Sequence, residues 1–510
     1  MSEARQSRPQ GIGAVGPGEG FAPPLKSISA PEGTLRGREA APSREWSFAE
    51  RYPALAYLER KGFREIRGIR VHYERAVEFT RVHVAPRVLE IDRRMFEDPK
   101  YYPADLMRTA CAYGLFSVPF PRAYGGLGLH PLATVIGLEV IATSCVGIAN
   151  LIGVSGLAIA IVLSTMDLRA ARRVAEMICE GERRGEPEFL STCVTEPGSG
   201  SDSEDREALA TARLCTVARP APGGYRLSGT KVFISNASLA SLHVVLAVRD
   251  LRDPVNTLTV LLVPSDAPGV SISRLEKKMG QKVCPAAEVV FDDVFVPEAQ
   301  CCRTADLSGK GIANVLALTR AGVGAFATGV AEGAYRLAHD YARTHCLLGV
   351  PLHRQQWAEL ALAQMARRAE LARASYVSAL LASCEGGLYG LVDDLTHGID
   401  PPRWIGKLSL WKRLTDSPRS LRRAARALER QRGDLLDAAA AAGDVAKVSS
   451  TDLALENCHE GLTLMGKDGM RHGLGAEKLL RDARLLQIYE GTNQVNLMDF
   501  AKRRMARRYD

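Results

Sequence analysis

The chain has 510 residues, of which 46% are hydrophobic and 24% are charged, and its formal net charge is +8. At ~150 residues per domain this length predicts about three domains, and the composition is that of a globular protein with a large core. Eleven cysteines without a CxxC pair exclude a disulfide framework and a zinc site, and they predict reduced thiols and no metal.

The N-terminal residues and the apolar segments predict a cytoplasmic protein. The first residues, MSEARQSRPQ, are polar and cannot form a secretory signal. Glu3, Glu19 and Glu32 interrupt the basic character that a transit peptide keeps. Uninterrupted apolar runs fall short of roughly 18 residues, so we expect no membrane span.

The positive charge arises from 66 Lys and Arg against 58 Asp and Glu. Such an excess can attract a polyanion, either nucleic acid or the phosphates of a small ligand. An Arg-rich surface spread over a large protein explains the same number. We favour that second interpretation, so a nucleic-acid partner is not expected.

The first two regions in chain order are a polar extension and a helical domain. Residues 1–45 are rich in Pro, Gly, Ser and Arg and are predicted to be disordered, because they offer too little apolar surface to offset chain entropy. Residues 46–190 are predicted to be helical, since apolar residues recur at three- and four-residue spacing over Val71–Phe96 and Pro103–Leu115.

Two further regions complete the chain. Residues 191–305 are predicted to form a middle β-domain, because short β-branched runs such as Thr257–Val263 and Val289–Val296 are bounded by Gly, Pro and Asp. Residues 306–510 return to the helical period, with an Arg-rich insertion at about 386–433. The order helical, strand, helical indicates an α+β fold with segregated layers.

Two segments of the middle region are candidates for ligand contact. Cys193–Asp202 (CVTEPGSGSD) is dense in Gly and Ser, which allows a backbone to approach a flat ring or a phosphate. Lys231–Ser235 offers an aromatic and a hydroxyl to a heteroaromatic ring. A plain surface loop and a core strand are the alternatives for these two segments.

Two helical segments are also candidates. Thr319-Arg320 lies near the start of a helix rich in small residues, where a lone Arg is usually a surface residue. Ile488–Gln494 (IYEGTNQ) places Glu490 beside Gly491. The pair can be a simple turn, or it can present a carboxylate to a ligand that excludes water and makes it a better base.

Six motifs in this order resemble the acyl-CoA dehydrogenase family over about residues 69–504. They are Pro119–Gly128 (PFPRAYGGLG), Cys193–Asp202 (CVTEPGSGSD), Gly229–Ser235 (GTKVFIS), Phe291–Pro297 (FDDVFVP), Thr319–Gly329 (TRAGVGAFATG) and Arg481–Gln494 (RDARLLQIYEGTNQ). The resemblance implies an N-terminal α-helical domain, a middle β-barrel-like domain and a C-terminal four-helix bundle. It also implies one FAD per subunit and a homo-oligomer, usually a tetramer.

The resemblance also implies roles for individual residues. Glu490 matches the catalytic base. The position used as the base in some other members is Thr319 here, which cannot serve. Substrate contacts are implied for Ser201, Arg320 and Gly491. FAD contacts are implied for Cys193, Val194, Thr195, Gly200, Ser201, Phe233, Ile234, Ser235, His345, Gln356, Gly466, Lys467, Thr492 and Gln494.

Several matched positions depart from the family pattern. Phe233 stands for the usual Trp beside the flavin and Ser235 for the usual Thr. His345 replaces an Arg that reaches the FAD pyrophosphate of a neighbouring subunit, and imidazole is a weaker and pH-dependent substitute. Lys467 replaces a Gly. We expect either that Lys467 compensates for the missing Arg or that FAD binding is weaker.

The function implied is α,β-dehydrogenation of an acyl-CoA or acyl-carrier thioester to the trans-2-enoyl thioester, with electrons passing to an electron-transfer-flavoprotein-type acceptor. Glu490 disfavours a monooxygenase on the same fold, whereas an acyl-CoA oxidase keeps the base. A non-catalytic, nucleic-acid-associated member is the third interpretation, favoured only by the charge and the Arg-rich insertion. That insertion has a second explanation as a solvated helix face.

Overall fold

The computed structural model describes residues 47–204, 206–303, 310–390, 403–406, 413 and 416–509. The predicted disorder of residues 1–45 lies outside them, as does part of the predicted insertion, at residues 391–402, 407–412 and 414–415. Within the described residues the order of helices, strands and helices confirms the α+β prediction.

The first region is helical. Its helices are α1 (Phe48–Arg51), α2 (Pro53–Arg60), α3 (Arg64–Phe79), α4 (Val88–Glu97), α5 (Ala104–Ala112), α6 (Pro131–Gly153), α7 (Ser155–Ser164) and α8 (Leu168–Arg184). The helical pattern predicted over Val71–Phe96 is confirmed, although it is not one continuous α-helix. A π-helical turn at Thr80–Val84 and a 3-10 turn at Ala85–Arg87 separate α3 from α4. The cause is Pro86, which has no backbone N–H to donate to the preceding turn.

A buried ion-pair network ties α1 to the helices behind it. Glu139 of α6 is fully buried, and its carboxylate lies 3.0 Å from Arg373 Nη2 and 3.6 Å from Arg51 Nε. Arg51 Nη2 also lies 3.1 Å from Glu332 Oε1, and Tyr52 donates its hydroxyl to Glu139 at 2.6 Å. Although burial raises the pKa of Glu139, the charges of Arg373 and Arg51 hold it below its usual range. The network therefore joins α1 and α6 to α11 (Ile312–Thr344) and α12 (Gln356–Gly386).

The middle region is one mixed sheet. Its strands are β1 (Phe189–Cys193), β2 (Val217–Ala221), β3 (Gly224–Ser235), β4 (Ala240–Val248), β5 (Leu258–Pro264), β6 (Val270–Leu275) and β7 (Ala286–Pro297). The strand order is β1-β4-β2-β3-β7-β6, with β5 beside β4. β1 pairs with β4 in parallel, and β3 pairs with β7 antiparallel. Two short helices, α9 (Arg206–Leu209) and α10 (Pro254–Thr257), connect the strands.

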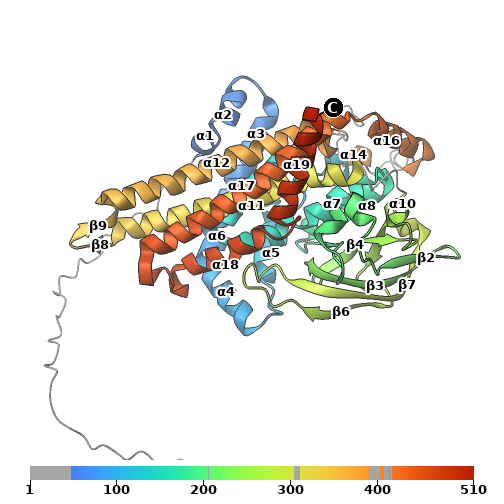
Figure 1. Ribbon diagram of the computed structural model, residues 1–510, viewed down its shortest axis with the longest axis horizontal. Coiled ribbons are helices and arrows are strands. Elements are labelled where there is room, and N and C mark those ends of the chain that lie inside the picture. The colour runs from blue at the N-terminus through green and yellow to red at the C-terminus, as the bar shows by residue number, and fades with distance from the viewer. Residues whose placement is uncertain are drawn as a thin grey trace, which may run out of the picture. The chain divides into compact units, whose positions relative to one another are not determined.

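The C-terminal region is helical again, and Figure 1 shows its long helices side by side. The elements are α11 (Ile312–Thr344), β8 (Cys346–Leu347), β9 (Val350–Pro351), α12 (Gln356–Gly386), α14 (Arg403–Gly406), α16 (Pro418–Arg430), α17 (Gly433–Met465), α18 (Ala476–Leu486) and α19 (Asn493–Tyr509). α11 also packs closely on α6, because a Cβ at Gly333 would overlap the carbonyl oxygen of Thr143.

Two helices bear on the expectation that the chain has no membrane span. Pro131–Gly153 and Ile312–Thr344 are long and apolar enough to cross a membrane by composition alone. Their most apolar 18-residue windows are 83% and 72% buried inside the protein, as expected of core helices. All eleven cysteines lie in the described residues, and all are free thiols.

α16 carries the Arg-rich pattern that the sequence singled out. Its apolar face packs Ala424 and Leu428 against Met166, and Lys310 Nζ donates to the Leu428, Glu429 and Gln431 carbonyls at its C-terminal end. Its exposed arginines recur at three- and four-residue spacing, so they share one side of the helix. They are Arg419, Arg422, Arg423, Arg426 and Arg430.

Candidate active site

A cavity of about 1380 Å³ extends between the sheet and the helices. Residues from α6, α7, α11, β1 and β3 and from the turn between α18 and α19 line it. It brings together much of the predicted site. The predicted residues in its lining are Val194, Thr195, Gly200, Ser201, Phe233, Ile234, Ser235, Glu490, Gly491 and Thr492.

One side of the cavity, here called the Phe233 wall, consists of Val194 and Thr195 after β1 and Phe233–Ser235 at the end of β3. The β3–β7 pairing shifts register between Lys231 and Ile234, which is the kind of irregularity that re-aims side chains. Phe233 has φ +59°, and the residue is 61% exposed. A bulky residue in the left-handed region is strained, and such strain is found where a structure over-determines a functional position.

A buried ion pair supports the Phe233 wall. Lys231 Nζ donates to the Val194 carbonyl at 2.9 Å and to Glu196 Oε1 at 2.8 Å, with both side chains almost fully buried. Glu196 also accepts from the backbone N–H of Cys215 and Thr216. Burial raises the pKa of Glu196, but the Lys231 charge and these hydrogen bonds hold it below the ordinary range. Glu196 and Lys231 each lie in one of the family motifs, but nothing in the sequence predicted that they form an ion pair.

The other side, here called the Glu490 wall, is the turn Glu490–Thr492 between α18 and α19. Glu490 has φ +56° and Gly491 has φ +75°. Lys447, fully buried in α17, donates to the Gly491 carbonyl at 2.6 Å and to Asn493 Oδ1 at 2.8 Å. Asn496 Nδ2 lies 3.4 Å from the Glu490 and Gly491 carbonyls. The strained turn is therefore held at both of its carbonyl groups.

Two contacts define how the Glu490 wall meets its surroundings. The Thr492 N–H donates to Ser201 Oγ at 3.3 Å, which links the turn to the segment after β1. Thr319 Oγ1 on α11 donates to Glu490 Oε2 at 2.8 Å. Sequence reasoning considered Thr319 only as a failed base. No sequence signal places it against Glu490, 171 residues away.

Arg320 lies next to Thr319 but is not among the described residues that line the cavity. It is 1% exposed and pairs with Asp444 on α17 and with Asp499 on α19, the latter at 2.8 Å. Burial raises the pKa of Asp444 to about 7, against the opposing charge of Arg320. Arg320 thus fixes two helices beside the turn, and its contact with substrate stays a prediction.

Two other predicted residues near the cavity take different positions. Cys193 is fully buried in the core of the sheet, so its backbone is the part that can face a ligand. Gln494, in the first turn of α19, is exposed and is absent from the described lining.

The remaining predicted cofactor residues gather at one end of the helical bundle, at the β8–β9 hairpin and the turn after α17. His345 stacks on Tyr341 with ring centroids 3.7 Å apart, and Tyr341 donates its hydroxyl to Asp468 at 2.9 Å. Asp468 follows Gly466 and Lys467, which line a second, open pocket. Gln356 begins α12 just after the hairpin and is exposed. None of these residues lines the larger cavity.

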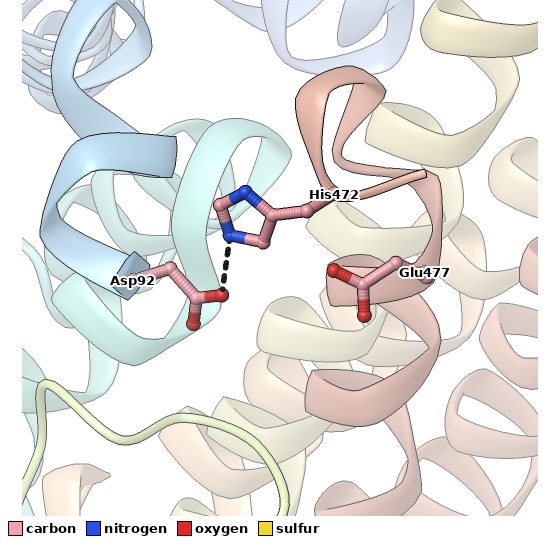
Figure 2. Close-up of side chains that lie close together, drawn as sticks. All are labelled: Asp92, His472 and Glu477. Atoms are coloured by element: carbon pink, nitrogen blue, oxygen red, sulfur yellow. Dashed lines mark hydrogen bonds and ion pairs between the residues drawn. The ribbon is translucent and has the colours of Figure 1, made fainter. Parts of the chain in front are cut away.

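One cluster in the described residues has metal-ligating side chains. Figure 2 shows Asp92, His472 and Glu477, with His472 Nε2 3.1 Å from Asp92 Oδ2. Arg481 already bonds both carboxylates, at 2.7 Å to Asp92 and 2.6 Å to Glu477. Burial raises the pKa of Asp92, but Arg481 and nearby Lys478 hold it low. A cation here would have to displace a guanidinium, so the cluster is best explained as an ion-pair network between α4 and α18.

Three family models match the chain. Residues 70–182 match the acyl-CoA dehydrogenase N-terminal domain, residues 191–294 the middle domain, and residues 309–388 and 409–505 the C-terminal domain. Isobutyryl-CoA dehydrogenase from Bos taurus mitochondria is 28% identical over 83% of this chain and 85% of its own length.

Solved structures share the fold. Butyryl-CoA dehydrogenase from Megasphaera elsdenii has a TM-score of 0.67 at 24% identity, over 86% of this chain and 98% of that one. An acyl-CoA dehydrogenase from Bacillus anthracis, solved in complex with FAD, has a TM-score of 0.66 at 22% identity, over 86% of this chain and 67% of that one. At these identities the likeness concerns the fold.

Proposed function

Because the chain belongs to the acyl-CoA dehydrogenase family, we propose that it is a FAD-dependent oxidoreductase that removes one hydrogen from Cα and one from Cβ of an acyl thioester, with Glu490 as the base. The observation that carries this proposal is the Glu490 turn. A carboxylate is held in a strained backbone conformation on the wall of a large cavity, and buried Lys447 and Asn496 fix the carbonyl groups around it.

The Phe233 wall fits a flat heteroaromatic ring. The exposed Phe233 ring offers a stacking face, and Thr195 and Ser235 offer hydroxyl groups along the same lining. We therefore assign FAD to this wall, where Phe233, Thr195 and Ser235 would hold its ring system. When bound, FAD supplies the hydride acceptor.

The chain supplies the proton transfer and the alignment. Glu490 takes the α-proton of the thioester as the β-hydrogen leaves with its electron pair, and the product is the trans-2-enoyl thioester. The backbone N–H of Glu490, aimed by the left-handed turn, is assigned to the thioester carbonyl, where it stabilises the charge that develops on oxygen. Ser201 and Gly491 are assigned to the thioester arm.

The test is to purify the protein, record its visible spectrum and add a panel of acyl-CoA thioesters without oxygen. We expect one or more thioesters to bleach the flavin absorbance. Glu490→Gln should slow bleaching about 10²–10⁴-fold, the usual contribution of a positioned base. Glu359→Gln, which removes an exposed carboxylate on α12, is the matched control and should bleach like the parent. A flavin-loaded parent that no thioester bleaches would sink the assignment.

We propose that His345, Gln356, Gly466 and Lys467 contact the FAD of a second copy of the chain. Their position at the bundle end, away from the cavity of their own chain, supports this role. The mass of the holoenzyme should then be that of a homo-oligomer. If Lys467 compensates for the missing Arg, Lys467→Ala apoprotein should bind FAD more weakly than the parent, and equal affinity would refute the compensation.

The carrier and the electron acceptor are the finer parts of the proposal. The exposed arginines of α16 suit an acidic partner, either the phosphates of CoA or an acidic carrier protein, and a flavoprotein is the proposed acceptor. Rapid flavin reoxidation in air would instead indicate an acyl-CoA oxidase. Salt-sensitive DNA binding without acyl-CoA turnover would favour the non-catalytic alternative.

A further inference from the structure

The Thr319 hydroxyl has two acceptors within hydrogen-bond distance. Its Oγ1 lies 2.8 Å from Glu490 Oε2 and 3.0 Å from the carbonyl oxygen of Val315, one turn earlier on α11. Thr319 lines the cavity, so the bond to Glu490 crosses from the long helix to the turn that carries the carboxylate.

A threonine hydroxyl carries one proton and can donate to one of these acceptors at a time. The Val315 carbonyl also accepts the helical bond from the Thr319 backbone N–H, so the helix does not depend on the hydroxyl. A bond to a charged carboxylate is stronger than one to a neutral carbonyl. While Glu490 is ionised, the Thr319 hydroxyl should therefore donate its hydrogen bond to Oε2.

We propose, on the basis of the function proposed above, that Thr319 is a positioning residue that holds Glu490 for proton abstraction and releases it once the proton has moved. Its bond to Oε2 fixes the direction of the carboxylate on the cavity wall, and the carboxylate forms the new O–H bond with the α-proton. The α-C–H bond breaks, and its electron pair becomes the second bond between Cα and Cβ as the β-hydrogen leaves with its own electron pair to the flavin. The Thr319 proton is not consumed.

Val315 gives this arrangement its second state. A donor on a carboxylate fixes its direction but also makes it a weaker base. When Glu490 gains a proton, the Thr319 hydroxyl can turn to the Val315 carbonyl, so it keeps a partner as the charge on Glu490 disappears. The cost to basicity is thereby limited, and the alignment before the transfer is retained.

The structural alternative is that Thr319 only makes the back-bond common to helical threonines. α11 contains a matched control, since Thr328 Oγ1 donates to the Gly324 carbonyl at 2.8 Å and is fully buried in the core. Thr328 makes the same type of bond and does not line the cavity. Val and Thr have similar helix propensities, so Thr→Val isolates the hydroxyl.

The experiment compares holoenzymes of the parent, Thr319→Val, Thr319→Ser and Thr328→Val. For each, the rate of anaerobic flavin reduction is measured from acid to alkaline pH with the best acyl-CoA of the panel, together with acyl-CoA affinity and thermal unfolding. Charged groups on the elements around Glu490 include Arg320 on α11, Asp444, Lys447 and Asp452 on α17, Asp482 on α18 and Asp499 on α19, and the parent and all three variants keep them. Differences between variants therefore report on Thr319.

Loss of a donor to a charged group predicts an about tenfold slower flavin reduction in Thr319→Val near neutral pH. The acid limb of the pH–rate profile of this variant should move to higher pH by about 1 unit, because the Glu490 carboxylate loses a hydrogen bond that favours its ionised form. Acyl-CoA affinity should stay within about twofold, since the contact is with the base and not the substrate. Thr319→Ser should restore both the rate and the limb, and Thr328→Val should leave both unchanged.

Three results would overturn the inference while leaving the proposed function intact: a Thr319→Val rate and limb equal to the parent, an equal loss in Thr319→Ser, or an equal loss in Thr328→Val. A parent that no acyl-CoA reduces would instead remove the proposed function, and this inference with it. The two failures are thus told apart by the parent alone.

Discussion

The two walls of the cavity solve one structural problem with different chemistry. Each presents a non-glycine residue at positive φ, Phe233 or Glu490, and each has a buried lysine behind it that donates to a backbone carbonyl of the wall. Behind Phe233, Lys231 is also paired with the carboxylate of Glu196. Behind Glu490, Lys447 donates to the neutral oxygens of Gly491 and Asn493.

The difference shows that a buried lysine can anchor a wall of the cavity with or without a carboxylate in the same set of bonds. The ion pair anchors the Phe233 wall strongly. If Lys231 is removed, however, the buried carboxylate of Glu196 is left without its cation. Lys447 holds the Glu490 turn through hydrogen bonds to neutral acceptors, and each such bond is weaker than a bond to a carboxylate. Substitutions at the two lysines should therefore differ in cost.

The largest effect is expected from Lys231→Met. It removes the partner of buried Glu196 and should lower the free energy of unfolding by about 3–5 kcal/mol in urea titrations. Lys231→Met combined with Glu196→Gln removes both charges and should recover most of that loss. A single-variant loss below about 1 kcal/mol would contradict the anchoring role.

Acid should reduce the stability that the Lys231–Glu196 ion pair gives to the folded protein. The pKa of Glu196 is lowered in the folded protein, so the contribution of the ion pair is fully present above the ordinary value of 4.5 and is lost as pH falls below it. Other carboxylates titrate in the same range, so the useful quantity is a difference. Below pH 4.5 the stability gap between parent and Lys231→Met should narrow. A gap that stays constant or widens in acid would refute the assignment.

Lys447→Met should cost less, about 1–3 kcal/mol, because it leaves neutral acceptors short of one donor. Its stronger signature should be slower flavin reduction by acyl-CoA, since the Gly491 carbonyl loses a bond that holds the Glu490 turn. Stopped-flow reduction and urea unfolding of the same preparation measure both. Unchanged reduction with lowered stability would show that the turn keeps its geometry without Lys447.

Phe233→Gly should have the smallest effect on stability, within about 1 kcal/mol. Glycine relieves the strain at φ +59° but costs chain entropy, and the exposed ring gives up little buried surface. FAD affinity should fall, because the stacking face is lost. Calorimetric unfolding of apoprotein and FAD titration separate the two. FAD binding equal to the parent would place the flavin elsewhere.

Local sequence patterns singled out short, unusual segments that lie on the cavity, and the family resemblance supplied their proposed roles. Gly- and Ser-rich 193–202 and the Glu490-Gly491 pair have compositions that ordinary helices and strands avoid, and both line the cavity. The α+β order followed from periodicity in the same way, because a change of apolar spacing is visible without tertiary contacts.

The anchors of the site could not be predicted in that way. Lys447 lies inside a long helix, where a lysine is common and signals no special role. Thr319 likewise looks like any threonine inside a helix. Their roles arise from contacts across 44 and 171 residues of sequence. The division of the helical segment at Pro86 was also not predicted, because the apolar spacing is helical on both sides of it.

The buried network around Glu139 has a practical consequence for anyone who shortens the chain. Sequence similarity to the family begins at residue 70, which invites a cut just before α3. Such a cut would discard Arg51 and Tyr52 and leave Glu139 and Glu332 with one cation and one hydroxyl fewer in the protein interior. A shortened chain should therefore keep the charge balance that Arg51 and Tyr52 provide upstream of the family match, together with α1 and its Ser47 cap.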